Sequence, residues 1–220
     1  MSAPEFPAAV LWDMDGTIID TEPYWMAEET AMVERAGGTW TSEQALHMVG
    51  SDLRQTAAAL RANTPVTGSD EEIVDALLSR VVARLRENIP WRAGAVDLIN
   101  ECSQAKVPMA LVTMSWQPLA QVLLDVLPAD TFDVVVTGDQ VANGKPHPEP
   151  YLTAAEQLGV DPGQCVAIED SPTGVASALA AGVTTLAVSH MVAVEDAPQA
   201  HHRSTLEGMD LAGLSRLFQH

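Results

Sequence analysis

Two carboxylates follow a short apolar stretch near the start of the chain. Residues 8–12 are all apolar, as in a strand buried on both faces of a parallel sheet, and Asp13, Asp15 and Gly16 come soon after them. Open α/β sheets bind ligands at the carboxyl edge of their strands, so these acids are expected at a binding site. Because Asp-Gly also closes many ordinary turns, the pair by itself predicts a site no better than a loop.

Further polar groups follow other apolar stretches. Thr113 and Ser115 supply two hydroxyls after one stretch, and Glu169 and Asp170 supply two carboxylates after another. Lys145, one of only two lysines in the chain, lies between these two groups in the sequence. Since parallel strands present their carboxyl ends at the same edge of a sheet, we expect these side chains to converge there.

Several carboxylates at one edge require a counter-ion, because crowding them without one drives some of them to bind protons. Oxygen ligands without Cys or His select a hard cation, and one that is held by few carboxylates beside a phosphate is typically Mg2+. With Mg2+ and Lys145 in place, a phosphoryl group is the natural anion for this edge.

The elements that must position these groups can be read from the hydrophobic pattern. Apolar stretches alternate with helical patterns, which predicts an α/β fold with a doubly wound, five-stranded parallel sheet. Strands are expected at 8–12, 107–112, 133–136, 165–168 and 183–188, and helices at 94–106, 119–127, 150–158 and 173–181.

The segment after the first strand has a different pattern. Between residues 22 and 90 there is no strand signal, and shorter helices are expected at 24–36 and 53–62. An amphipathic helix is predicted by apolar residues at three- and four-residue spacing, namely Val74, Leu77, Leu78, Val81, Val82 and Leu85. We therefore expect a catalytic core of residues 1–20 and 91–220, with residues 21–90 as a small helical cap over the carboxyl edge.

Composition narrows the class of partner. Thirty acidic residues against eleven basic ones give a formal charge of -19, which disfavours binding to nucleic acid or anionic lipid. No apolar run approaches the ~20 residues that span a bilayer, and the start lacks a basic segment followed by an apolar one. We expect a soluble, cytoplasmic monomer with no membrane partner, in which Cys102 and Cys165 are reduced core residues and His201-His202 belongs to a solvated tail.

Four segments carry a family resemblance when they are taken together. They are D-M-D-G-T from Asp13, the threonine Thr113 after an apolar strand, G-D-x-V-x-x-G-K-P-x-P from Gly138, and E-D-S-x-x-G from Glu169. In order and spacing they resemble the four motifs of the haloacid dehalogenase superfamily. The helical insert is similar to that of the members related to β-phosphoglucomutase and phosphoglycolate phosphatase.

The resemblance implies a role for each motif residue. Asp13 would be the nucleophile that forms an aspartyl phosphate, and Asp15 would be the general acid and base. Thr113, Ser115 and Lys145 would bind the phosphoryl oxygens.

The same resemblance implies a metal site. Asp13, the backbone carbonyl of Asp15, and Asp170 would hold Mg2+, with Glu169 near the ion directly or through water. In the insert, where such families place substrate contacts, Gly50 and Arg54 are candidates, while Asp20 is expected to be a structural acid at the hinge.

The resemblance leaves several activities open. The first is a Mg2+-dependent phosphatase acting on a small phosphorylated metabolite, and the second is a sugar phosphomutase like β-phosphoglucomutase. The insert has no lysine, which disfavours two of the activities that the resemblance allows. The sugar mutases of the family use an insert lysine near the phosphate, and a phosphonate hydrolase would use one to form a Schiff base. A non-enzymatic aspartyl-phosphate switch is a third reading, disfavoured because Asp15 supplies turnover chemistry. A haloacid dehalogenase in the strict sense is disfavoured too, because that reaction would not use Asp15 or the carboxylates expected to bind the metal.

Overall fold

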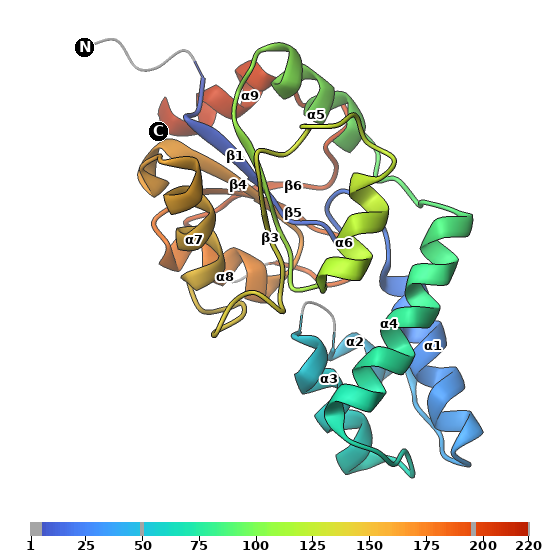
Figure 1. The fold of residues 1–220 in the computed structure, drawn as a ribbon. Helices are drawn as coiled ribbons and strands as arrows, with labels where there is room; N and C mark the ends of the chain where they lie inside the picture. Colours follow the sequence, from blue (N-terminus) through green and yellow to red (C-terminus); the bar gives the residue numbers. More distant parts are fainter. Residues whose placement is uncertain (1–5, 49–50, 195–196, 220) are drawn as a thin grey trace.

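A six-stranded parallel sheet forms the centre of the computed structural model, which describes residues 6–48, 51–194 and 197–219 (Figure 1). The order is β3-β2-β1-β4-β5-β6, so the first strand lies in the middle. This confirms the doubly wound α/β prediction. The strands are β1 (Ala9–Trp12), β2 (Met109–Val112), β3 (Val134–Val136), β4 (Cys165–Glu169), β5 (Thr184–Val188) and β6 (His201–Arg203).

Strand β1 shows why the central strands are apolar at every position. Ala9 and Leu11 pack toward the side covered by α7 and α8, whereas Val10 and Trp12 pack toward the side covered by α5, α6 and α9. Alternate side chains of a strand face opposite sides, so a strand with helices on both faces needs no polar residue. The helices are α5 (Ala95–Gln104), α6 (Gln117–Leu124), α7 (Glu149–Leu158), α8 (Pro172–Ala180) and α9 (Leu211–Arg216), with short 3-10 turns at Pro162–Gln164 and Leu217–Gln219.

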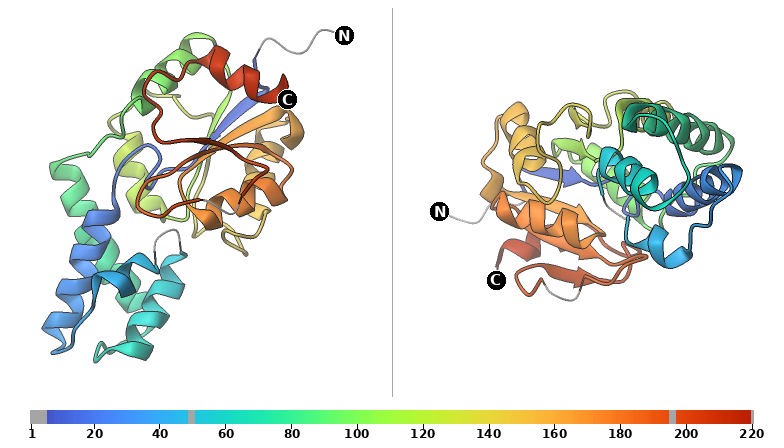
Figure 2. Two further views of the ribbon diagram at one scale, coloured as in Figure 1. Left: turned by 180° about the vertical axis from the view of Figure 1, so that it is seen from behind. Right: turned by 90° about the horizontal axis from the view of Figure 1, so that it is seen from below.

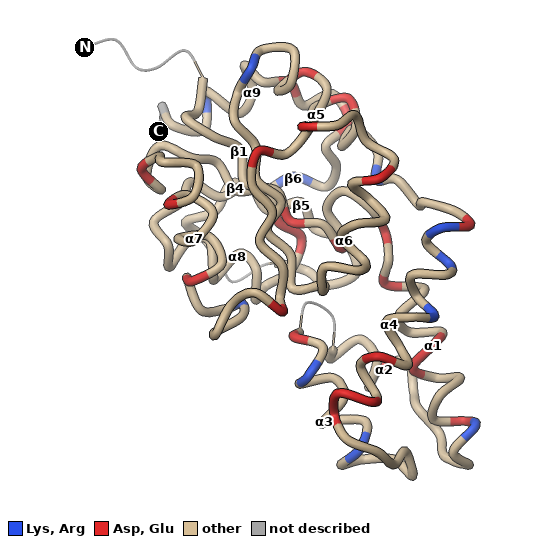
Figure 3. Tube along the Cα trace, viewed as in Figure 1, with Lys and Arg blue, Asp and Glu red and all other residues tan. Residues whose placement is uncertain are grey.

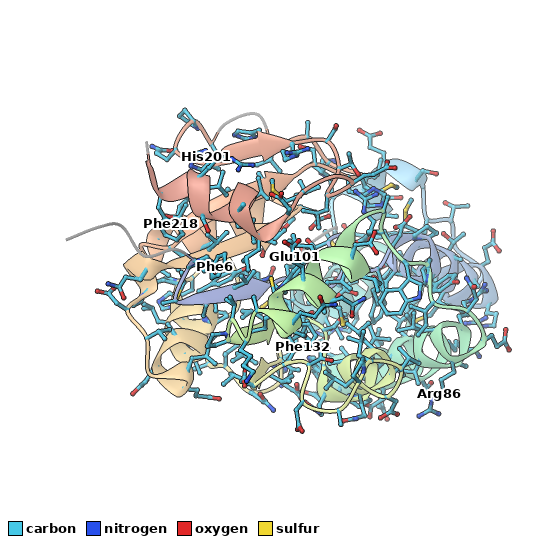
Figure 4. All side chains as sticks on the ribbon, turned by 90° about the horizontal axis from the view of Figure 1, so that it is seen from above. Phe6, Arg86, Glu101, Phe132, His201 and Phe218 are labelled. Atoms are coloured by element: carbon cyan, nitrogen blue, oxygen red, sulfur yellow. The ribbon has the colours of Figure 1, made fainter. Side chains whose placement is uncertain are left out.

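The sheet has one strand more than the five that were predicted. His201 and His202 belong to β6, which pairs in parallel with β5, so they lie in a strand and not in a tail. Their side chains are half-buried and exposed, respectively, in keeping with the expectation that the pair is solvated. The sequence H-H-R has no apolar pattern because an edge strand is held by backbone hydrogen bonds and its side chains stay in solvent. Figure 4 shows His201 at the outer edge of the molecule, across from Arg86 on the helical insert.

The described part of the chain between β1 and α5 contains four helices, which form the helical insert. They are α1 (Glu22–Arg35), α2 (Ser42–Leu46), α3 (Leu53–Asn63) and α4 (Asp70–Glu87). The apolar stripe that predicted the longest of them, from Val74 to Leu85, is buried along α4. The short α2 was not expected, and it begins at a capping box in which Thr41 and Gln44 bond each other's backbone N–H groups. Among the described helices, none combines the length and apolarity that crossing a bilayer requires.

The chain enters and leaves the insert through two adjacent segments. Asp20 N–H donates to the Pro90 carbonyl at 2.8 Å, and Arg92 N–H donates to the Ile18 carbonyl at 2.9 Å. The Asp20 carboxylate also lies 2.8 Å from His190 Nε2. Figures 1 and 2 show that this hinge leaves the insert beside the carboxyl ends of the strands.

Candidate active site

The register of two neighbouring strands brings the acids of separate motifs together. Trp12 of β1 pairs with Ile168 of β4, and Asp13 N–H donates to the Ile168 carbonyl at 3.0 Å. Asp13 therefore follows β1 at the level at which β4 ends in Glu169 and continues to Asp170. One carboxylate oxygen from each acid lies within 4.8 Å of the others, and all three side chains are buried.

Lys145 is the cation at the centre of these acids. It comes from the loop after β3, and its Nζ donates to Asp13 Oδ1 at 2.7 Å, to Glu169 Oε1 at 2.6 Å and to the Val112 carbonyl at 2.9 Å. Its side chain is only 3% exposed. Burial opposes the charged ammonium, but the adjacent Asp13 and Glu169 carboxylates outweigh it and raise the pKa of Lys145 above its ordinary value.

One lysine does not neutralise three buried carboxylates. Burial, followed by the charge of Glu169, raises the pKa of Asp13 to about 8 even though Lys145 acts in the opposite direction. Burial and the charge of Asp13 raise the pKa of Asp170 well above its usual range. Asp13 Oδ2 is buried and accepts no hydrogen bond from any described residue. Buried acceptors are nearly always satisfied, so a second cation fits this edge.

Glycines make the close approach of these acids to the backbone possible. A Cβ at Gly16 would lie 2.0 Å from Asp170 Oδ2, and Gly16 also has a φ of +84°. A Cβ at Gly174, in the first turn of α8, would lie 2.0 Å from Glu169 Oε2. The glycines of the D-x-D-G and E-D-S-x-x-G motifs are therefore needed because a side chain at either position would collide with an acid of the site.

Glu169 differs from Asp13 and Asp170 in having both oxygens occupied. Oε1 accepts from Lys145 and from the Tyr151 hydroxyl at 2.6 Å, while Oε2 accepts from Asp170 N–H at 3.2 Å. No described residue donates to the side chain of Asp170. Of the two predicted acids at the end of β4, Asp170 is the one left with free acceptor capacity.

Asp15 is held by two threonine hydroxyls. Thr21 donates to its Oδ1, and Thr113 donates to its Oδ2 at 2.9 Å. Thr113 Oγ1 also accepts from Ser115 N–H at 2.9 Å. The structure thus brings both predicted hydroxyl residues to the site, with the Thr113 hydroxyl bound to Asp15. Ser115 lines the same pocket as Asp13.

The two candidates in the insert have different outcomes. Arg54 stands at the start of α3 with its guanidinium 5.0 Å from the centre of the Trp116 ring. It lines a groove between α3 and the loop 138–148, next to the acid cluster and outside the pocket that contains Asp13. Gly50 lies outside the described residues.

Sequence reasoning missed three residues of this region. Tyr151, fully buried on α7, donates a hydrogen bond from its hydroxyl to Glu169 Oε1. Glu22 and Glu29 of α1 are buried in the wall of the pocket that contains Asp13 and Asp15. Their seven-residue spacing, with Trp25 between them on the same helix face, was an available signal.

Comparison with known proteins assigns a family. The model for haloacid dehalogenase-like hydrolases matches residues 10–188. Hexitol phosphatase A of Escherichia coli is 33% identical over 184 residues, covering 81% of this chain and 82% of that protein. A phosphoglycolate phosphatase of Xanthomonas campestris is 33% identical over 184 residues, covering 83% of each.

A solved structure is similar to this chain over almost its whole length. CbbY from Rhodobacter sphaeroides, crystallised with phosphate, has a TM-score of 0.87 and 29% sequence identity, covering 94% of this chain and 99% of that one. The family predicted from the four motifs is confirmed. The chain belongs to the haloacid dehalogenase-like hydrolases, and among them to the phosphatases.

Proposed function

We propose that this protein is a Mg2+-dependent phosphatase that hydrolyses phosphate monoesters of small metabolites through an aspartyl phosphate on Asp13. The observation that carries the proposal is the state of the Asp13 carboxylate. Lys145 holds Oδ1, whereas Oδ2 is buried and accepts no hydrogen bond from the described residues, and Asp13 lines a pocket. A carboxylate that is fixed through one oxygen and free at the other is arranged for attack on phosphorus.

Mg2+ suits the donor set at this edge, which consists only of oxygens, with one carboxylate oxygen each of Asp13, Glu169 and Asp170 within 4.8 Å of the others. Asp13, Asp170 and the backbone carbonyl of Asp15 would hold the ion. Glu169 would contribute through water, because its own oxygens already accept hydrogen bonds. When bound, the ion supplies positive charge that offsets the charge of the transferred phosphoryl group.

In the first step an oxygen of Asp13 bonds to phosphorus and the ester P–O bond breaks. Asp15 gives its proton to the departing alcohol oxygen, from the position in which Thr21 and Thr113 hold its carboxyl group. Lys145 and Ser115 bind phosphoryl oxygens from the side of the pocket that they line. The phosphoryl group is then carried by Asp13 and the alcohol is free to leave.

In the second step Asp15, now ionised, takes a proton from a water molecule that attacks the phosphorus. The bond between Asp13 and phosphorus breaks, inorganic phosphate is released, and both aspartates regain their starting states. The helical insert, placed at the carboxyl edge of the sheet, would act as the cap that limits access of water and selects the alcohol.

A sugar phosphomutase uses the same first step and returns the phosphoryl group to a second sugar hydroxyl. Two observations favour hydrolysis. Residues 21–90 contain no lysine, and the relatives at 33% identity described above are phosphatases.

The test is release of phosphate from p-nitrophenyl phosphate by the purified protein, with Mg2+ and with EDTA. We expect turnover that requires Mg2+ and is abolished in Asp13→Asn. Glucose 1-phosphate is assayed in parallel for conversion to glucose 6-phosphate, which would identify a mutase. Undiminished hydrolysis by Asp13→Asn would overturn the proposed mechanism.

A further inference from the structure

The wall of the pocket that faces the acid cluster is one side of helix α1. Glu22, Trp25, Met26 and Glu29 all line this pocket. Their spacing of three, four and seven residues places them on a single helix face. A sequence that puts two acids on a face with apolar neighbours builds a surface of mixed character, in the same pocket that Asp13 lines.

Glu22 is buried without a partner. It is 7% exposed, and no described residue donates a hydrogen bond to its carboxyl group or forms an ion pair with it. Burial, with the charges of Asp15 and Glu29 next in importance, raises the pKa of Glu22 to about 8. Burying a carboxyl group without a hydrogen-bond partner costs folding free energy. Because Glu22 lines the pocket, a ligand bound there could supply the missing partner.

Glu29 is held in place more firmly. The indole N–H of Trp40 donates to its Oε2 at 3.1 Å, and the side chain is 4% exposed. Burial raises the pKa of Glu29 to about 7, while the hydrogen bond from Trp40 acts in the opposite direction. Trp40 thus fixes one oxygen of a carboxyl group that still lines the pocket.

The cations of the insert are directed elsewhere. Figure 3 shows much of the basic charge on the insert, which contains Arg35, Arg54, Arg61, Arg80, Arg84 and Arg86. Arg84 Nε donates to Glu28 at 2.6 Å, and Arg54 lies over Trp116. Among the described residues that line the pocket, Lys145 is the only cation, and it is already bound by Asp13 and Glu169.

We infer that Glu22 and Glu29 bind hydroxyl groups of the leaving alcohol and restrict the enzyme to monophosphates whose remaining part is neutral and rich in hydroxyls, such as alditol or sugar phosphates. Carboxyl groups accept hydrogen bonds from neighbouring hydroxyls and, when protonated, also donate one. The ring of Trp25, between them, offers an apolar surface to the carbon chain.

The same wall rejects a second anionic group. A carboxylate or second phosphate on the substrate would lie against two acidic side chains, with no free cation among the described residues that line the pocket. Its charge would stay unpaired there, and it would oppose any ionisation of Glu22 and Glu29, whose pKa values burial already raises. This inference rests on the proposed function, because it assumes that the phosphoryl group is transferred to Asp13.

The test compares kcat/KM for sorbitol 6-phosphate, phosphoglycolate and p-nitrophenyl phosphate in the Mg2+-loaded enzyme. We expect the wild type to prefer sorbitol 6-phosphate over phosphoglycolate by at least a hundredfold. In Glu22→Gln and in Glu29→Gln this ratio should fall at least tenfold, mainly through a higher KM for sorbitol 6-phosphate and a lower KM for phosphoglycolate. Glu34→Gln, which removes the same charge from an exposed position of α1, should keep the wild-type ratio.

Two outcomes would overturn the inference while leaving the proposed function intact. One is a wild type that hydrolyses phosphoglycolate as efficiently as sorbitol 6-phosphate. The other is a uniform loss on all three substrates in both Gln variants, which indicates a structural role. If the wild type fails to hydrolyse p-nitrophenyl phosphate as well, the proposed function fails and the inference falls with it.

Discussion

The two walls of the active-site pocket treat their acids in opposite ways. At the sheet edge, Asp13 and Glu169 are joined by Lys145, and Glu169 is bound further by Tyr151. On α1, Glu22 has no partner among the described residues and Glu29 has a single indole N–H. Both walls are buried, so the difference lies in hydrogen bonding rather than in solvent access.

Under the proposed function, the difference corresponds to a division of labour between the walls. Phosphoryl transfer is the same for every substrate, and its groups can be held rigidly by partners from within the chain. Recognition of the alcohol needs hydrogen-bond acceptors and donors that have no partner until the ligand binds. The sheet edge is therefore expected to be sensitive to single changes in both stability and activity, whereas α1 should mainly affect selectivity.

Lys145→Met should have the largest effect. It leaves Asp13 and Glu169 buried without their cation, which we expect to destabilise the protein by about 4 kcal/mol, as is typical when one partner of a buried pair is removed. Hydrolysis of p-nitrophenyl phosphate should fall by about a thousandfold or more, since the nucleophile loses its anchor. Urea unfolding and steady-state kinetics measure the two effects, and exposed Lys106→Met is the control. A stable, active Lys145→Met variant would contradict the view that partners within the chain hold the acids of this wall rigidly.

Gly16→Ala should have the next largest effect. Its Cβ would collide with Asp170, and alanine is strained at a φ of +84°, so we expect about 3 kcal/mol of destabilisation and about a hundredfold loss of kcat. The matched control is Gly159→Ala, which has a φ of +72° and no atom within 4 Å of the added Cβ. It should cost only about 1 kcal/mol and leave the kinetics unchanged. Equal effects of the two substitutions would show that backbone strain alone, and not the contact with Asp170, matters at Gly16.

The pH dependence of stability should identify Glu29 in the other wall. Its folded-state pKa, about 7, lies above the ordinary value of 4.5, so the folded protein holds a proton that the unfolded chain has lost. The unfolding free energy contributed by Glu29 is therefore greatest below pH 4.5 and declines as pH rises toward 7, by about 3 kcal/mol at most. Thermal unfolding in EDTA between pH 5 and 8 should show a flatter decline for Glu29→Gln than for the wild type. Parallel curves for the two proteins would contradict the assignment.

Tyr151→Phe should have the smallest effect of the four. It removes one hydrogen bond to Glu169 while Lys145 remains bound, so we expect a loss of about 1.5 kcal/mol and a kcat within about tenfold of the wild type. Denaturant unfolding with the kinetic assay provides the measurement. A loss as large as that of Lys145→Met would mean that the tyrosine, rather than the lysine, organises Glu169.

Much of the fold could be predicted because its signals are local. The apolar run 8–12 and the alternation of strands and helices beyond residue 91 follow from burial on both faces of a sheet. Strand β6 could not be predicted in the same way, since a three-residue edge strand is selected by pairing with β5 and has no hydrophobic pattern of its own. The short α2 depends on a capping box rather than on an apolar stripe.

By itself, the sequence determined which residue types follow each strand, and hence that Asp13, Asp15, Lys145 and Asp170 would meet at one edge. Only the tertiary structure decided how they share partners. The Thr113 hydroxyl binds Asp15, and both oxygens of Glu169 accept hydrogen bonds. The register of β1 with β2 and β4 brings these side chains within hydrogen-bond distance of their partners. The packing of α1 above the sheet edge likewise turned Glu22 and Glu29 into a pocket wall. Such contacts join residues far apart in the chain, and no local pattern encodes them.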